Sequence, residues 1–229
     1  MGDRDRSAGR GWFVTLEGPE GAGKTVVAER LRVVLDARGV HVCSTREPGG
    51  TPLGERIRTI LLEHLPDDAP LDPWTDALLF NAARAQLVRQ VIRPALDRGD
   101  VVLCARFTDS TLAYQGFGAG LPLDDLRALN AIATGGLEPD LTILLDLPVE
   151  SGLARKAAGE QTRFESGFDL SFHRRIRGGF LALAADSPRF VVVDATAPLE
   201  EVVDLATAAV EAIVTGSGEL SGAAMRIHR

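Results

Sequence analysis

One segment of the chain combines glycine, lysine and threonine at a spacing that binds phosphate. Residues 18–25 read Gly-Pro-Glu-Gly-Ala-Gly-Lys-Thr, which satisfies the pattern G-x-x-x-x-G-K-[ST] in full. The three glycines permit backbone conformations in which successive N–H groups point at phosphate oxygens. Lys24 is expected to span β- and γ-phosphates, and Thr25 to present its hydroxyl to Mg²⁺. The predicted ATP-binding residues are Gly18, Gly21, Ala22, Gly23, Lys24, Thr25 and Val26.

The sequence around this segment supports a binding role. The apolar run Trp12–Leu16 precedes it, and Val26–Asp36 follows with apolar residues at helical spacing. This strand–loop–helix order disfavours the alternative, a glycine-rich turn with no ligand. The pattern leaves several classes open, namely small-molecule kinases, GTPases, ATPase motors and regulators.

Two further polar segments also follow apolar runs. Residues 105–116 (ARFTDSTLAYQG) come after Val101–Cys104, and residues 45–54 (TREPGGTPLG) come after Val40–Cys43. Ligands of parallel sheets bind at the carboxyl ends of the strands, so both segments are predicted to lie at the site. Arg106 directly follows a buried run, where an unpaired charge is costly, so it is expected to have an anionic partner.

Five nearly continuous apolar runs alternate with helical patterns, which predicts an α/β fold. Such runs are typical of a parallel sheet whose two faces are both covered by helices. With the phosphate loop after the first run, the expectation is a P-loop NTPase-type sheet of about five strands in a single domain over residues 1–215, with a flexible tail at 216–229. The runs are Trp12–Leu16, Val40–Cys43, Val101–Cys104, Leu141–Leu145 and Phe190–Val193.

Composition and segment lengths argue against several other classes of protein. The 229 residues are 45% hydrophobic and 25% charged, which indicates a folded chain, and the net charge of −7 gives no general reason to bind nucleic acid. Cys43 and Cys104 lie in apolar runs without metal-binding spacing, so they are expected to be buried and reduced, as in an intracellular protein. The sequence shows neither a signal peptide nor an apolar stretch of the ~18–20 residues that span a membrane, which predicts a soluble cytoplasmic protein.

Five segments together resemble bacterial thymidylate kinases in order and spacing, over roughly residues 11 to 214. The resemblance implies transfer of the γ-phosphoryl group of MgATP to the 5′-phosphate of dTMP or a modified thymidylate-like deoxynucleotide. It also implies a homodimer, with the apolar helix around residues 78–92 as one candidate interface, although a helix buried inside the monomer would show the same pattern. The segments are Glu17–Thr25, Thr45–Gly54, Leu78–Gln86, Arg106–Gly116 and Val193–Ala195.

The same resemblance implies which side chains bind the acceptor base and sugar. Phe80 would stack on the thymine, and Arg84, on the same helix face at i+4, would bond a base carbonyl. Ser110 and Thr111 complete the base contacts, and Tyr114 crowds the ribose 2′ position. Without the resemblance, Phe80 is equally well a core residue, Arg84 a solvated helix charge, and Tyr114 a cap on the core.

Charged residues are assigned to the phosphates in the same way. Arg106 would clamp the acceptor phosphate, and Arg58 would supply a second cation or else remain a solvated helix charge. Glu20 resembles the family's acidic residue near the sugar 3′-hydroxyl and the reacting phosphates.

A polar stretch at residues 152–166 corresponds to the family's lid. Its candidates for a catalytic cation are Arg155, Lys156 and Arg163, and Glu165 resembles a carboxylate near the metal or the phosphates. Positive charge brought onto the transferring phosphoryl group would favour the reaction. The alternative is a mobile polar surface loop with scattered charges.

One departure from the family lies beside the phosphate clamp. Ala105 stands where the family usually has Asp, which removes a negative charge from the surroundings of the metal. Three interpretations remain open: an engineered substitution, a slow or specialised kinase for a modified or different pyrimidine nucleotide, and a nucleotide-binding protein that has lost catalysis.

Overall fold

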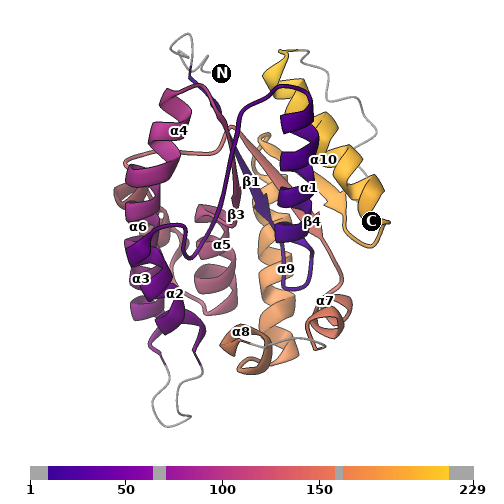
Figure 1. Ribbon diagram of the computed structural model, residues 1–229. Coiled ribbons are helices and arrows are strands. Elements are labelled where there is room, and N and C mark those ends of the chain that lie inside the picture. Colours follow the sequence, from indigo (N-terminus) through magenta and orange to yellow (C-terminus); the bar gives the residue numbers. More distant parts are fainter. Residues whose placement is uncertain (1–9, 64–70, 158–161, 217–229) are drawn as a thin grey trace.

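Five parallel strands form one sheet in the order β2-β3-β1-β4-β5 in the computed structural model, which describes residues 10–63, 71–157 and 162–216. The predicted α/β fold with a five-stranded parallel sheet is confirmed (Figure 1). The second strand begins two residues later than expected, because the Val40 N–H bonds the Leu35 carbonyl and belongs to the turn after the preceding helix. The strands are β1 (Trp12–Glu17), β2 (Val42–Arg46), β3 (Val101–Ala105), β4 (Leu141–Asp146) and β5 (Phe190–Asp194).

Helices cover both faces of the sheet (Figure 1). Helices α1 and α10 pack on one face, and α4, α9 and the π-helical turns η1 and η2 contribute to the other. The helical segments are α1 (Lys24–Ala37), α2 (Pro52–Leu62), α3 (Pro73–Leu87), η1 (Val88–Ile92), α4 (Arg93–Asp97), α5 (Thr108–Thr111), η2 (Leu112–Gly118), α6 (Leu123–Thr134), α7 (Val149–Lys156), α8 (Arg163–Ser166), α9 (Leu170–Ala185) and α10 (Leu199–Val214).

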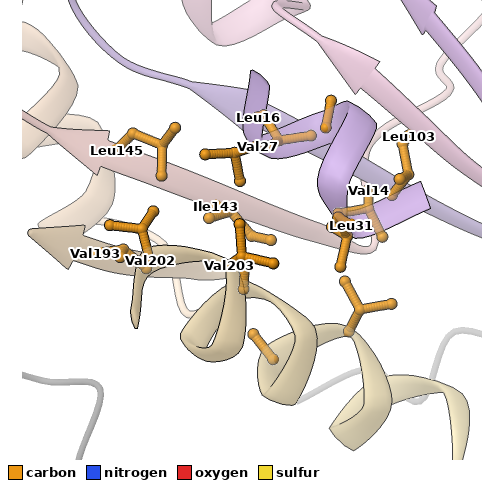
Figure 2. Packing of buried hydrophobic residues seen from close by; sticks show 14 of the residues in the cluster. Val14, Leu16, Val27, Leu31, Leu103, Ile143, Leu145, Val193, Val202 and Val203 are labelled. Carbon is orange, nitrogen blue, oxygen red and sulfur yellow. The ribbon is translucent and has the colours of Figure 1, made fainter. Parts of the chain in front are cut away.

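The largest apolar cluster lies between the sheet and helices α1 and α10 (Figure 2). Val14 and Leu16 of β1 point into it, whereas Phe13 belongs to the cluster on the opposite face. Because successive side chains of a strand point to opposite faces, a strand buried on both sides needs apolar residues at nearly every position. This explains the continuous apolar runs of the sequence and fixes β1 at the centre of the sheet.

The helices beside the site begin at residues suited to that position. The Thr51 hydroxyl accepts a hydrogen bond from the Gly54 N–H at the start of α2, and Pro52 follows as the first helical residue. Asp72 caps α3 in the same way and is followed by Pro73. These caps stabilise the two helix starts and thereby fix where α2 and α3 begin.

The structure bears on the predictions about the two cysteines, the polar insert and membrane-spanning segments. Cys104 is buried as predicted, but Cys43 is only half-buried because β2 is an edge strand, and both are free thiols. The predicted polar insert is helical at its start, where α7 extends to Lys156; residues 158–161 and the tail from 217 lie outside the described residues. Within the described ranges, no helix has the length and hydropathy needed to cross a membrane.

Candidate functional site

The carboxyl ends of the central strands open into a cavity of about 370 Å³. Its lining brings together side chains from segments that are far apart in the sequence, as the strand-end argument predicts. Of the predicted site residues, the lining contains Glu20, Gly21, Gly23, Lys24, Thr25, Val26, Arg58, Phe80, Arg84, Arg106, Ser110, Thr111, Tyr114 and Arg155. Of the predicted residues that the structure describes in full, Gly18, Ala22 and Arg163 do not line it.

The phosphate loop is folded around its own lysine. Lys24 Nζ donates to the carbonyl oxygens of Gly18 at 2.9 Å and Pro19 at 2.7 Å. Gly21 has a φ of 72°, and a Cβ there would lie 2.1 Å from the Gly152 carbonyl oxygen, so this position requires glycine. Burial, with a further contribution from Arg106, lowers the pKa of Lys24 to about 7. An anion bound in the loop would favour the protonated, charged form of Lys24.

The metal-binding potential of the site rests on few protein groups. Thr25 is exposed in the first turn of α1, where its hydroxyl can reach a ligand, whereas Ala105 offers no oxygen. No group of three or more His, Cys, Asp or Glu side chains in the described ranges is arranged to hold a metal ion. Mg²⁺ commonly keeps several waters and binds substrate phosphates with one or two protein ligands. The residues present fit an ion held mainly by phosphate oxygens and water.

Glu20, Arg106 and Tyr114 form a compact polar cluster over the cavity. The Glu20 carboxylate accepts from Arg106 at 2.6 Å and from the Tyr114 hydroxyl at 2.7 Å, while the Arg106 guanidinium lies 4.9 Å from the centre of the Tyr114 ring. Burial opposes ionisation of Glu20, but Arg106 and Lys24, together with Tyr114 and Lys156, outweigh it and lower the pKa to about 2. Arg106 has the expected anionic partner, and its φ of 69° is a left-handed conformation that is uncommon outside glycine.

Glu17, at the end of β1, positions the loop that carries Arg106, a role the sequence analysis did not assign. Its carboxylate accepts from the Phe107 N–H at 2.7 Å, the Ser110 N–H at 3.3 Å and the Ser110 hydroxyl at 2.6 Å. Burial, followed by repulsion from Asp109, raises the pKa of Glu17 to about 7. The sequence signal that could have revealed this role is the position of Glu17, an ionisable residue at the end of a buried strand.

Arg84 is almost completely enclosed, so the interpretation as a solvated helix charge is wrong. Its guanidinium bonds the Glu47 carboxylate, with a shortest distance of 2.7 Å, as well as the side-chain oxygens of Asn81 and Asn130 and the Phe107 carbonyl. These contacts use all five donors of the side chain. Its predicted bond to a base carbonyl therefore requires one of these partners to be exchanged.

The remaining residues predicted to bind the acceptor line the cavity with polar and apolar groups. Phe80 is half-buried on α3, and Arg58 of α2 is half-buried with a 2.9 Å hydrogen bond to the Pro48 carbonyl. The Thr111 hydroxyl is buried and has no hydrogen-bond partner among the described residues. A buried hydroxyl without a partner is costly, so this atom is suited to bond a ligand.

The predicted cations of the polar insert lie in two different places. Arg155 of α7 donates to the Ala195 carbonyl at 3.2 Å and to the Gly21 carbonyl at 3.5 Å, and Lys156 also lines the cavity. Arg163 instead pairs with Asp76 of α3. The side chain of Glu165 lies outside the part of the molecule that the structure describes, so its assignment stays a prediction.

Comparisons with known proteins give one consistent family. The family model described as thymidylate kinase matches residues 16–206. A thymidylate kinase of Deinococcus radiodurans is 55% identical over 194 residues, 84% of this chain and 92% of that protein. Those of Desulfovibrio desulfuricans and Thermomicrobium roseum are 52% identical over 216 residues and 54% over 206, which cover 90% and 89% of this chain and 98% and 96% of the relatives.

Proposed function

The chain belongs to the thymidylate kinase family, and from that membership we propose that it transfers the γ-phosphoryl group of ATP to dTMP. An oxygen of the acceptor 5′-phosphate attacks the γ-phosphorus, the bond to the β–γ bridging oxygen breaks, and ADP and dTDP are released. The observation that carries the proposal is the single cavity that joins the phosphate loop to Arg106 and Phe80. Donor and acceptor can thus meet in one cavity, which brings the two reacting phosphates together.

The donor side of the reaction is assigned to the phosphate loop. Loop N–H groups and the start of α1 bind the β- and γ-phosphates, and Lys24 stabilises the charge on their oxygens as the bond breaks. Mg²⁺, with Thr25 as its protein ligand, would neutralise charge on the phosphates when bound. Gly18 and Ala22 shape the loop, and Val26 continues it into the helix.

The acceptor side is assigned to the segment that follows β3, with contributions from α2, α3 and the phosphate loop. Arg106 binds the acceptor phosphate, with Arg58 as a second cation, and Phe80 stacks on the base. Glu20 orients Arg106 and Tyr114, the latter beside the sugar. Ser110 and Thr111 complete the base contacts, and the Thr111 hydroxyl has an unused donor and acceptor for this purpose.

The catalytic cation is proposed to come from α7. Arg155 and Lys156 line the cavity beside the phosphate loop, where positive charge would stabilise the transferring phosphoryl group. Arg163 can serve this role only if it leaves Asp76. Glu165 remains a proposed carboxylate near the metal or phosphates.

The proposed reaction is tested by measuring ADP release in a coupled assay. ATP is supplied alone or with dTMP, dUMP, dCMP, AMP or GMP in turn, and we expect release that depends on the acceptor and is fastest with dTMP. ADP release without any acceptor, or faster turnover with AMP or GMP than with dTMP, would contradict the proposal.

We also propose that the protein forms a homodimer through the exposed part of α3. Leu87, Val88 and Ile92 are buried inside the monomer, but Trp74 and Leu78 lie one turn apart on α3 and are 37% and 54% exposed. Leu78→Asp should shift the mass measured by light scattering from dimer to monomer. Val33→Asp, on the exposed side of α1, is the matched control and should leave the mass unchanged.

A further inference from the structure

One aromatic side chain of the acceptor side comes from α8 and has no role in the proposed reaction. Phe164 is 5% exposed and lines the same cavity as Phe80 and Tyr114. Its ring centre lies 6.1 Å from that of Phe80 and 5.6 Å from that of Tyr114, and the Phe164 and Tyr114 rings are nearly perpendicular. Since Phe80 and Tyr114 are the proposed base and sugar contacts, Phe164 lies at the nucleoside end of the cavity.

The residue before it anchors α8 to the acceptor side of the molecule. The Arg163 guanidinium pairs with the Asp76 carboxylate of α3 and also donates to the Leu61 carbonyl at the end of α2. It lies 4.3 Å from the centre of the Phe164 ring. The side chains of Arg163 and Asp76 are only 11% and 9% exposed, so this ion pair is shielded from solvent.

Asp76 is in turn fixed by the segment that carries Tyr114. Gln115 Nε2 donates to the second carboxylate oxygen of Asp76 at 3.0 Å. One carboxylate therefore connects α3, η2 and α8, which are the three elements that supply Phe80, Tyr114 and Phe164. Breaking a shielded pair by removing one partner is costly, so α8 is expected to stay in this position while the pair is intact.

We propose that Phe164 is a specificity-determining residue that forms one wall of the acceptor nucleoside subsite, and that Asp76 is the positioning residue that holds it there through Arg163. The inference rests on the proposed dTMP kinase function and adds a wall to its acceptor site. It gives Arg163 an anchoring role, separate from the cationic role proposed for Arg155 and Lys156.

The wall is tested with Phe164→Ala and a matched control. Phe168 stacks on Phe164 with ring centres 5.9 Å apart, but it is 37% exposed and does not line the cavity. Phe164→Ala should raise the dTMP Kd, measured by calorimetry, and the dTMP KM by up to about tenfold, because the nucleoside loses an aromatic contact. The KM for ATP should not change, and Phe168→Ala should leave all three constants within about twofold of wild type.

Selectivity among acceptor nucleotides should change only if Phe164 contacts the nucleoside, and not if Phe164 merely stabilises the fold. Removing the wall should lower the preference for dTMP over a deoxyuridylate with a bulky 5-substituent about tenfold in kcat/KM, because the larger base gains space. An unchanged preference together with an unchanged dTMP Kd in Phe164→Ala would overturn the inference. Wild-type protein without dTMP-dependent ADP release would instead refute the proposed function.

The positioning role of Asp76 is tested by a double-mutant cycle with Arg163. Asp76→Asn and Arg163→Gln should each raise the dTMP KM about fivefold with little change in the KM for ATP, and the double variant should show no more than the larger single effect. Glu150→Gln, which breaks the exposed pair with Arg174, is the control. The role of Asp76 would be overturned if the increases in dTMP KM of the two single variants multiplied in the double variant, or if the KM values for dTMP and ATP rose equally. Thermal unfolding of each variant verifies that it is folded.

Discussion

The Arg106 guanidinium lies 2.6 Å from the Glu20 carboxylate, so the end of β3 is tied to the phosphate loop by an ion pair. Glu20 also accepts the Tyr114 hydroxyl, which links the proposed phosphate clamp to the proposed sugar contact. Burial lowers the pKa of Arg106, but Glu20, Tyr114 and Glu17 together outweigh it and raise this pKa above its ordinary value, so the guanidinium stays charged. A dianionic acceptor phosphate would therefore meet a cation that is already held in position, which reduces the ordering needed on binding.

Lys24→Ala should lower kcat by at least about 10²–10³-fold, the range typical for removing one group that stabilises transition-state charge. The fold should remain, because Lys24 bonds only carbonyl oxygens of its own loop. The coupled ADP assay measures the rate, and circular dichroism verifies the fold. Wild-type ADP release by a folded Lys24→Ala protein would show that the loop does not act on the phosphates.

Ala105→Asp should raise kcat about tenfold and lower the Mg²⁺ midpoint, because losses of outer carboxylates around a metal typically cost about 10–100-fold. Ala105 ends β3 beside Arg106 and lines the cavity with Thr25, so an added carboxylate would face the phosphates. Mg²⁺ titrations of both proteins at saturating ATP and dTMP measure the effect. Unchanged turnover and an unchanged midpoint would place this position outside the metal's surroundings.

Phe80→Ala should raise the dTMP KM by more than the ATP KM. Losing a stacking surface costs about 1–3 kcal/mol per base, or roughly 5- to 150-fold. Initial rates with each substrate varied in turn measure both constants, and Leu53→Ala, an exposed change on α2, serves as control. Equal increases for the two substrates would argue against base stacking by Phe80.

Glu17→Gln should change the pH dependence of stability. The pKa of Glu17 is raised from 4.5 to about 7, so the folded state binds this proton more tightly than the unfolded state. Its contribution to stability is therefore fully present below 4.5 and is lost as the pH rises through about 7. The Tm of wild type should fall relative to that of Glu17→Gln between about pH 5 and 8.

Scanning calorimetry across this range, with the exposed change Asp97→Asn as control, checks the Glu17 prediction. A constant Tm difference between wild type and Glu17→Gln would show that Glu17 does not titrate there.

Arg84→Ala should destabilise the protein by about 3–5 kcal/mol, because it leaves the buried Glu47 carboxylate without its partner. Urea denaturation measures the free energy of unfolding. Arg127→Ala, on the exposed face of α6, should change it by less than about 0.5 kcal/mol. The double change Arg84→Ala with Glu47→Gln should recover part of the loss; additive losses would contradict the pairing.

The sequence predicts well where the residues at the strand ends lie. Arg106 follows a continuous apolar run, and parallel strands place such residues at one edge, so its arrival beside the phosphate loop follows from local pattern and topology. The resemblance to thymidylate kinases added Phe80 and Tyr114, which the structure brings to the same cavity.

Partners that are distant in the sequence were not predictable in this way. Glu17 and Ser110 are 93 positions apart, and Arg163 and Asp76 are 87 apart. Each pairing depends on how whole helices pack on the sheet, which hydrophobic spacing does not specify. For the same reason, helix periodicity could not distinguish a buried Arg84 from a solvated one, since its partner Glu47 comes from another element.

The chain contains only two lysines, Lys24 and Lys156, and both line the same cavity. The lowered pKa of Lys24, about 7, leaves a large fraction of this amine unprotonated and nucleophilic at neutral pH. Amine-selective acylating reagents should therefore label the side chains of this protein in its nucleotide cavity and nowhere else on the described surface. Mass spectrometry of the labelled protein, with and without ATP, would then report cavity occupancy without a turnover assay.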